Sequence, residues 1–171
     1  MTFLSRLLGK SPDDRAPVRP LWHWVVAEAR APDWYAHLGI ADTLPGRFDA
    51  LTLVLATVML RMERDEALIG PSALLAELFV EDMDGQLRQA GVGDLVVGKR
   101  IGKLMGALGG RIAALREGLA ADDAALIEVA RRNATMLEHG DPAKIAARLR
   151  ALAGRLEAVS GEALLTGNVP A

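Results

Sequence analysis

The chain has 171 residues, of which 51% are hydrophobic and 25% charged, which suits one domain with a sizeable core and argues against disorder. Lysine and arginine number 20 against 22 aspartates and glutamates, and this balance argues against a general nucleic-acid binder. The chain has no cysteine, which excludes disulfides, thiolate metal sites and cysteine nucleophiles.

Residues 1–20 are expected to be an N-terminal amphipathic segment followed by a linker. A helix over residues 1–10 would carry on one face Phe3, Leu4, Leu7 and Leu8. Such a face can rest on an anionic membrane surface. A frayed or docked tail is the alternative, because so short a helix is marginal in water. Residues 11–20 are polar and rich in proline, which is typical of a linker.

From residue 21 onward the sequence carries helix signals, and no segment shows the sustained alternation of a β-strand. Thr43 or Asp42 can cap one helix, and three further helices can be capped by Asp94, Asp122 and Asp141. The longest apolar run, residues 51–60, is half a membrane span and predicts a buried helix. The expected helices cover residues 21–30, 33–38, 43–64, 70–89, 94–119, 122–139 and 141–159, with a loose tail over 161–171. The fold class is therefore all-α, a single-domain bundle of about six helices.

The helix expected over residues 94–119 carries three stripes. Its apolar stripe spans about 80° of the helix surface and predicts contact with the core. The apolar residues are Val97, Ile101, Leu104, Leu108, Ile112, Leu115 and Leu119. The opposite side carries a cationic stripe of Lys99, Arg100, Lys103 and Arg111. Between the two lies a glycine stripe of Gly98, Gly102, Gly106 and Gly109.

The glycine stripe needs a structural reason, because each interior glycine costs about 0.5–1 kcal/mol of helix stability relative to alanine. Glycine removes the side chain that would keep a neighbouring backbone away, so the stripe predicts a closely packed helix. That neighbour belongs either to this chain or to a second chain.

Residues 93–100 match the start of a phosphate-binding loop, G-x-x-x-x-G-K. The loop needs serine or threonine after the lysine, where this chain has Arg100, and a hydrophobic strand before it, where residues 86–90 are polar and helical. A helix start is therefore favoured. A nucleotide-binding enzyme is the alternative, and it requires that ATP raise the melting temperature.

Other chemical motifs are incomplete. Residues 70–74 begin like a nucleophile elbow but lack its second glycine and preceding strand, so a helix cap is favoured. The acidic run 81–85 lacks the later ligands of a calcium loop and is interpreted as a solvated face. The histidines, His23, His37 and His139, share no metal-ligand spacing. The sequence thus indicates no catalytic residue, no metal and no cofactor, and predicts a protein that is not an enzyme.

Aromatic residues gather near the start of the chain: Trp22, Trp24, Trp34 and Tyr35. Packing in the core is the favoured interpretation. The alternative is an amphipathic contact surface, where such rings are enriched.

Three stretches resemble the ubiquinol–cytochrome c chaperone family, the assembly factors of the cytochrome bc1 complex. The first, residues 34–51, contains the family's aromatic-Tyr, Leu-Gly, Asp-Thr and Gly-Arg-Phe elements. The second, residues 81–100, is similar to the family's Asp-Met-Asp, Leu-Arg and Gly-Val-Gly-Asp block and ends in Gly-Lys-Arg. The third and weaker match is Gly110-Arg111 together with Asn133. The resemblance spans about residues 21–133.

The resemblance implies a chaperone with no catalytic residues. It implies cytochrome b or an early assembly intermediate as the partner, with the ribosome or a small partner protein as further candidates and no DNA. It also implies a place in the cytoplasm, with peripheral contact at the cytoplasmic face of the inner membrane. The expected organisation is an N-terminal segment and linker (1–20), a chaperone-family helical domain (21–140), and a C-terminal helix and tail (141–171).

The residues carried over from the family motifs are Trp34, Tyr35, Arg47, Asp82, Asp84, Arg88, Lys99, Arg100 and Arg111. With Lys103, they are the candidate partner-binding residues. The cationic stripe is the best candidate surface for an acidic partner, ribosomal RNA or anionic lipid. The alternative is that Arg47 and Arg88 hold Asp82 and Asp84 in internal ion pairs. A general helical adaptor at a membrane surface or ribosome is the competing function.

Overall fold

The structure is a computed structural model that describes residues 13–170. The described residues are helical throughout apart from turns and one isolated bridge between Ile40 and Met136, so the all-α prediction is confirmed. The α-helices are α1 (Arg19–Ala29), α2 (Asp33–Ala36), α3 (Leu44–Met62), α4 (Ile69–Gln89), α5 (Asp94–Ala120), α6 (Asp123–Asn133), α7 (Pro142–Glu157) and α8 (Gly161–Leu165). Short 3-10 turns, η2 (Ala16–Val18) and η3 (Glu66–Leu68), precede α1 and α4.

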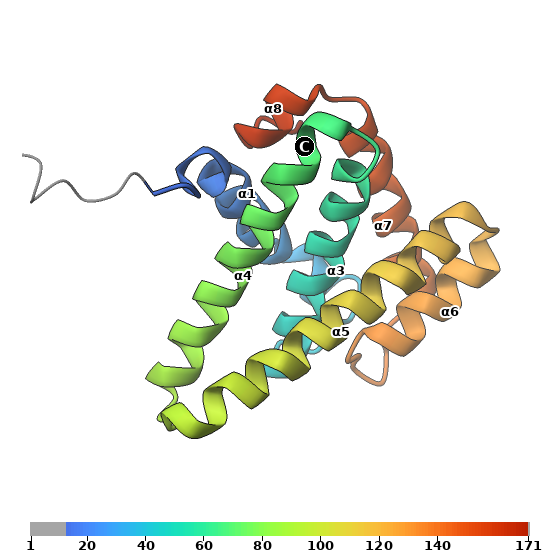
Figure 1. Cartoon of the computed structure of the whole chain (residues 1–171). Coiled ribbons are helices and arrows are strands. Elements are labelled where there is room, and N and C mark those ends of the chain that lie inside the picture. The colour runs from blue at the N-terminus through green and yellow to red at the C-terminus, as the bar shows by residue number, and fades with distance from the viewer. Residues whose placement is uncertain (1–12, 171) are drawn as a thin grey trace, which may run out of the picture.

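Helix α3 is the centre of the bundle, and α1, α5 and α7 pack around it (Figure 1). Its apolar run over residues 51–60 is buried except for the partly exposed Leu51 and Met59, as predicted. Thr43 caps the helix, since its hydroxyl accepts a hydrogen bond from the backbone N–H of Gly46. No helix among residues 13–170 combines the length and the apolarity that crossing a bilayer requires.

Helices α4 and α5 meet at the turn over residues 90–93 and then diverge, with α3 behind the opening between them (Figure 1). The far part of α5 packs against α3 and α6. The bounds expected for α4 and α5 agree with the structure to within one residue. The cap of α5 differs, because Gly93 is the capping residue and Asp94 lies in the first turn.

Helix α6 is shorter than expected, because it ends at Asn133 and not at His139. Beyond that point tertiary contacts replace helical hydrogen bonds: the backbone N–H and hydroxyl of Thr135 both donate to the carboxylate of Asp49, at 2.8 and 2.6 Å. The Thr135 carbonyl accepts from the N–H of Ala41 at 2.8 Å. The expected extension was wrong because the buried carboxylate, on a helix far away in sequence, takes the backbone out of the helix.

The C-terminal residues are not the loose tail that was expected. The Ser160 hydroxyl accepts from the N–H of Ala163 at 3.2 Å and caps α8, and Leu164 is fully buried. Gly167 has a φ of +70° and lies against the carbonyl of Pro20, where a Cβ atom would come within 2.9 Å of oxygen. A five-residue helix with one buried leucine has too little periodicity to be recognised from sequence.

The linker expected over residues 11–20 is partly ordered into the bundle. Val18 is fully buried, and α1 begins at Arg19. The amphipathic pattern of residues 1–10 lies outside the described residues, as does the start of that linker. The division of the chain at residues 20 and 140 stays a prediction.

Candidate partner-binding site

Arg111 points into the bundle, away from the other cations of its predicted stripe. Its guanidinium, with 11% of the side chain exposed, forms an ion pair with the buried Asp49 of α3. It also donates to the hydroxyl of Thr52 and lies 5.2 Å above the ring of Phe48. Because Asp49 accepts from Thr135 as well, this cluster joins α3, α5 and the segment after α6. Arg111 therefore has a structural contact, which a wheel of one helix does not reveal.

The remaining cations of the stripe, Lys99, Arg100 and Lys103, form the cationic flank of α5. All three are exposed and, among the described residues, make no ion pair. Unpaired charges on a stiff helix are available to an anionic partner.

The glycine stripe is open. Cβ atoms built on Gly98, Gly102, Gly106 and Gly109 have no heavy atom within 4 Å among the described residues. The closely packed helix that the stripe predicts is thus not found in residues 13–170. Close packing on α5 occurs at another glycine, Gly118, where a Cβ atom would meet Val129 of α6 at 3.0 Å.

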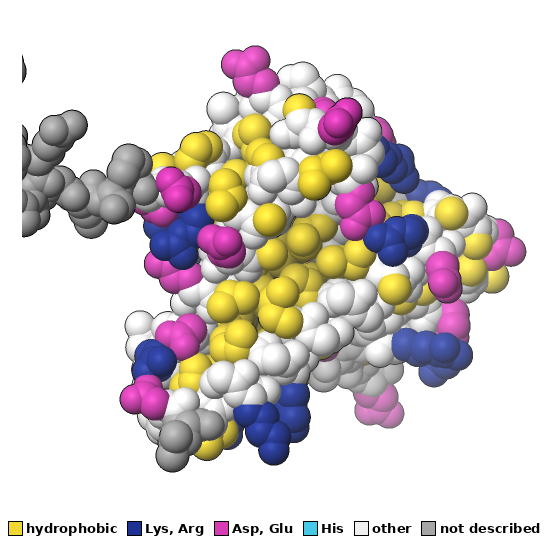
Figure 2. Space-filling view, viewed as in Figure 1, with side chains coloured by type: hydrophobic (Ala, Val, Ile, Leu, Met, Phe, Trp, Pro, Cys, Tyr) yellow, Lys and Arg dark blue, Asp and Glu magenta, His cyan; other side chains and the backbone are white. Residues whose placement is uncertain are grey.

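An apolar groove lies between α4 and α5, and we name it the α4–α5 groove. Figure 2 shows hydrophobic side chains gathered in the opening between these helices, with Lys and Arg on the far side of α5. A hollow of about 360 Å³ in it is lined by Arg15, Ala73, Ala76, Glu77, Val80, Glu81 and Met105. Gly102 and Gly109 lie three residues before and four residues after Met105, so the glycine stripe continues the α5 wall of the groove. The α5 side of the groove is therefore shallow along this stripe, because glycines have no side chains.

The acidic motif residues of α4 are held locally. Arg88 donates to Asp84 at 2.7 Å and also pairs with Asp94, which fixes the turn between α4 and α5. Asp82 accepts from Gln86 at 3.2 Å. Of the ion pairs that the sequence suggested as an alternative to partner binding, the pair of Arg88 with Asp84 is present, although it is exposed.

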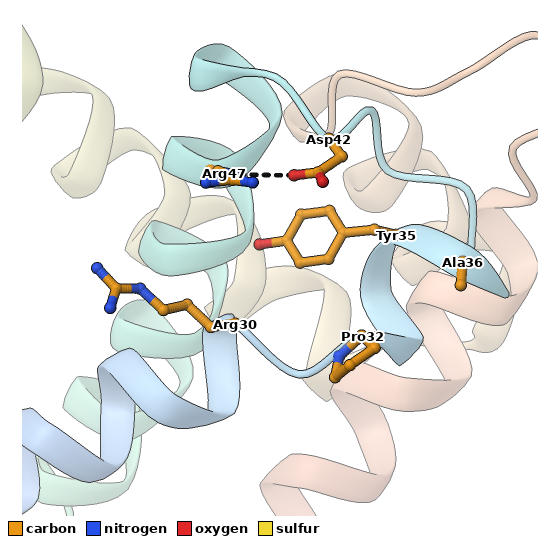
Figure 3. Close-up of a pocket in the computed structure, with 6 residues that line it drawn as sticks. All are labelled: Arg30, Pro32, Tyr35, Ala36, Asp42 and Arg47. Atoms are coloured by element: carbon orange, nitrogen blue, oxygen red, sulfur yellow. Dashed lines mark hydrogen bonds and ion pairs between the residues drawn. The ribbon is translucent and has the colours of Figure 1, made fainter.

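A second hollow, of about 570 Å³, lies where α1, α2 and the start of α3 meet. Figure 3 shows Tyr35 pointing between Arg30 and the pair formed by Arg47 and Asp42, whose Nε–Oδ1 distance is 2.6 Å. The hydroxyl of Tyr35 donates to the carbonyl of Ala29 at 2.7 Å. Two motif residues, Tyr35 and Arg47, are thus brought together.

The charges of this second hollow act on its titratable groups. Burial raises the pKa of the Tyr35 hydroxyl, the carboxylate of Asp42 raises it further, and Arg47 and Arg30 oppose both effects. The hydrogen bond from Arg47 lowers the pKa of the Asp42 carboxyl. Arg47 is therefore already paired with Asp42. The Tyr35 hydroxyl stays protonated at pH values above its ordinary pKa.

The aromatic cluster divides between the two interpretations. Trp34 is fully buried, and its ring N–H donates to the carbonyl of Glu28 at 3.0 Å, so it packs in the core. Trp22 is buried against Phe79, with ring centroids 6.3 Å apart. Trp24 and Tyr35 are partly exposed.

Residues 93–100 form the first turns of α5, so the phosphate-loop pattern marks a helix start, and the described chain before it is the helix α4. Sequence reasoning missed the α4 wall of the groove, Ala73, Ala76 and Val80. Their small size and helical spacing are a weak signal, which becomes visible only when α4 and α5 are placed side by side.

Comparison with known proteins supports the motif resemblance and extends it. A family model described as ubiquinol-cytochrome C chaperone matches residues 36–171. The chain is also similar to the crystal structure of the Cbp3 homolog from Brucella abortus, with 31% sequence identity and a TM-score of 0.79. That similarity covers 98% of this chain and 95% of the other. No curated protein matches the sequence. The family match continues past Asn133, so it includes α7 and α8.

Proposed function

We infer that this chain, which belongs to the ubiquinol–cytochrome c chaperone family, is an assembly chaperone of the cytochrome bc1 complex, and we propose that it binds newly made cytochrome b or an early intermediate. The proposal makes it a binding protein and not an enzyme. Supporting this, the one sequence pattern that suggested a nucleotide enzyme begins at the capping Gly93 and continues through the first turns of α5.

The observation that carries the proposal is the α4–α5 groove, an apolar surface with a cationic flank along the same helix. A membrane protein that has not yet been inserted or assembled exposes apolar helical segments of about 20 residues. An apolar groove with glycines along its α5 side suits such a segment, because backbones can approach closely there. The cationic flank suits acidic residues or phosphate groups at its end.

The proposal also concerns the place of action and further partners. We place the protein in the cytoplasm, at the cytoplasmic face of the inner membrane, where it would meet cytochrome b as it is made. The further partners that we propose are the ribosome or a small partner protein, and they do not include DNA.

Capture from membranes tests the binding step. We expect cytochrome b to copurify with the tagged full chain from detergent-solubilised membranes, and deletion of the gene to lower the level of assembled bc1 complex. Normal bc1 levels after deletion would reject the chaperone role, and capture of other subunits without cytochrome b would reject the proposed partner.

A helical adaptor for a membrane surface or ribosome is a second candidate, and the exposed cationic flank favours it. Reversing the charge at Lys99, Arg100 and Lys103 separates the two. The result favours the adaptor function if liposome or ribosome binding is lost while cytochrome b is still captured. The result favours the chaperone function if the capture of cytochrome b and the level of assembled bc1 complex fall together.

A further inference from the structure

The described chain begins at the rim of the α4–α5 groove. Arg15 lines the groove and forms an ion pair with Glu81 of α4 at 3.1 Å. Asp13 in turn pairs with Arg15 and Arg19. The preceding residues, 1–12, are therefore tethered beside an apolar surface that the described residues leave open. We propose that residues 1–10 dock in the α4–α5 groove as an amphipathic helix in the free protein, with Ser11 and Pro12 as the connection to Asp13.

The length and the pattern of the segment fit the groove. Ten helical residues extend about 15 Å, and the α4 wall from Ala73 to Val80 extends about 10 Å at the same rise per residue. The helix therefore covers the wall, and Ser11 and Pro12 connect it to Asp13. Its one apolar face consists of Phe3, Leu4, Leu7 and Leu8.

The glycine stripe fits a docked helix. The α5 wall offers Met105 with Gly102 and Gly109 beside it, and the α4 wall offers Ala73 and Ala76. Small residues on both walls let a helix backbone come close, and bulky leucines from the segment fill the space that they leave. Docking thus supplies the close neighbour that the stripe predicts and that residues 13–170 do not contain.

Charge and tethering favour this segment over other occupants. The α4 rim carries the exposed carboxylate of Glu77 beside Glu81, which already pairs with Arg15, while the segment carries Arg6 and Lys10. Attachment at Asp13 gives the segment an effective concentration on the order of millimolar, well above that of a second copy in dilute solution. The inference goes beyond the proposed function, since it concerns the free protein and does not require cytochrome b.

The absence of cysteine allows a direct test. A nitroxide attached to the full chain carrying Ser5→Cys should broaden the backbone amide signals of Ala76 and Met105 and spare those of α7. We expect these signals to lose most of their intensity, to the same extent at every dilution. Adding Leu4→Asp and Leu7→Asp to the labelled chain should restore them.

A matched pair of glycine variants tests the docking surface. Gly102→Gln places a side chain on the groove wall, and Gly154→Gln places the same side chain on an exposed site of α7; both sites have open space in the described structure. We expect the first variant to abolish the broadening and the second to retain it. Unbroadened groove signals would overturn the proposal, and so would broadening that fades on dilution, which would indicate a second copy. Transfer of the label to phosphatidylglycerol vesicles without groove broadening would overturn it in favour of the membrane.

Discussion

The two halves of α5 contain the same kinds of residue and use them differently. In the half beyond residue 107, Leu108 and Leu115 are buried, Gly118 lies against α6, and Arg111 is paired inside the bundle. In residues 94–107 the glycines are open and the cations exposed. A glycine or an arginine on this helix therefore has no fixed role, and its role depends on whether α3 and α6 lie beside it. Under the proposed function, the packed half serves folding, and the open half, with the open Gly109 beside it, serves binding.

The largest expected effect is at Arg111. Arg111→Ala leaves the buried Asp49 without its cation, and breaking such a buried pair costs about 3–5 kcal/mol. Urea denaturation should show that loss, while Lys103→Ala in the open half should change the free energy of unfolding by less than about 0.5 kcal/mol. Equal stability of the two variants would break the distinction between the halves.

Glycine substitutions should give a smaller effect of opposite sign. Gly154→Ala, on the exposed face of α7, should raise the free energy of unfolding by about 0.5–1 kcal/mol, because alanine is the better helix former and its Cβ has open space. Gly118→Ala should gain less, because its Cβ would lie 3.0 Å from Val129 and 3.2 Å from Leu126. The same denaturation series measures both, and a larger gain at Gly118 would contradict the packing described for α6.

Charge reversal of the cationic flank should affect binding and hardly affect stability. The variant with Lys99, Arg100 and Lys103 changed to glutamate should unfold within about 0.5 kcal/mol per site of the parent, since exposed, unpaired charges contribute little. Partner capture should fall, and the salt dependence of the remaining binding should weaken. A strongly destabilised variant would mean that the flank has contacts within the bundle.

The smallest effect is the titration of the single tyrosine. Because burial raises the pKa of Tyr35 above its ordinary value of 10.0, tyrosinate absorbance should appear at higher pH in the folded chain than in urea. The favoured form is the protonated one, so the stabilisation is complete below pH 10.0 and is lost as the pH rises through the higher, folded pKa. Arg47→Gln should raise this pKa further, because Arg47 opposes the shift. A pKa that falls in that variant would contradict the geometry of the second hollow.

Sequence periodicity and capping predicted the helices well where the signal is local. Thr43, Asp122 and Asp141 cap helices as expected, since each accepts hydrogen bonds from the first turn that follows it. The signal failed where the decisive contact is distant in sequence. The end of α6 depends on Asp49, which lies 86 residues before Thr135.

The candidate site was only partly predictable for the same reason. The exposed cationic flank follows from the helical wheel of α5 alone. The inward position of Arg111 and the apolar α4–α5 groove require the neighbouring helices, because they depend on which side of α5 faces α3 and α4. The sequence motifs identified the protein family, but they did not locate the candidate binding surface on the structure.

A photo-crosslinking residue at Gly102 tests the central claim, that the open half of α5 binds cytochrome b, most directly. The matched control carries the same residue at Gly154, an equally open helical glycine on α7. In membranes that are making cytochrome b, we predict a crosslink to cytochrome b from position 102 and none from position 154. Crosslinking from neither position, or equally from both, would contradict the account.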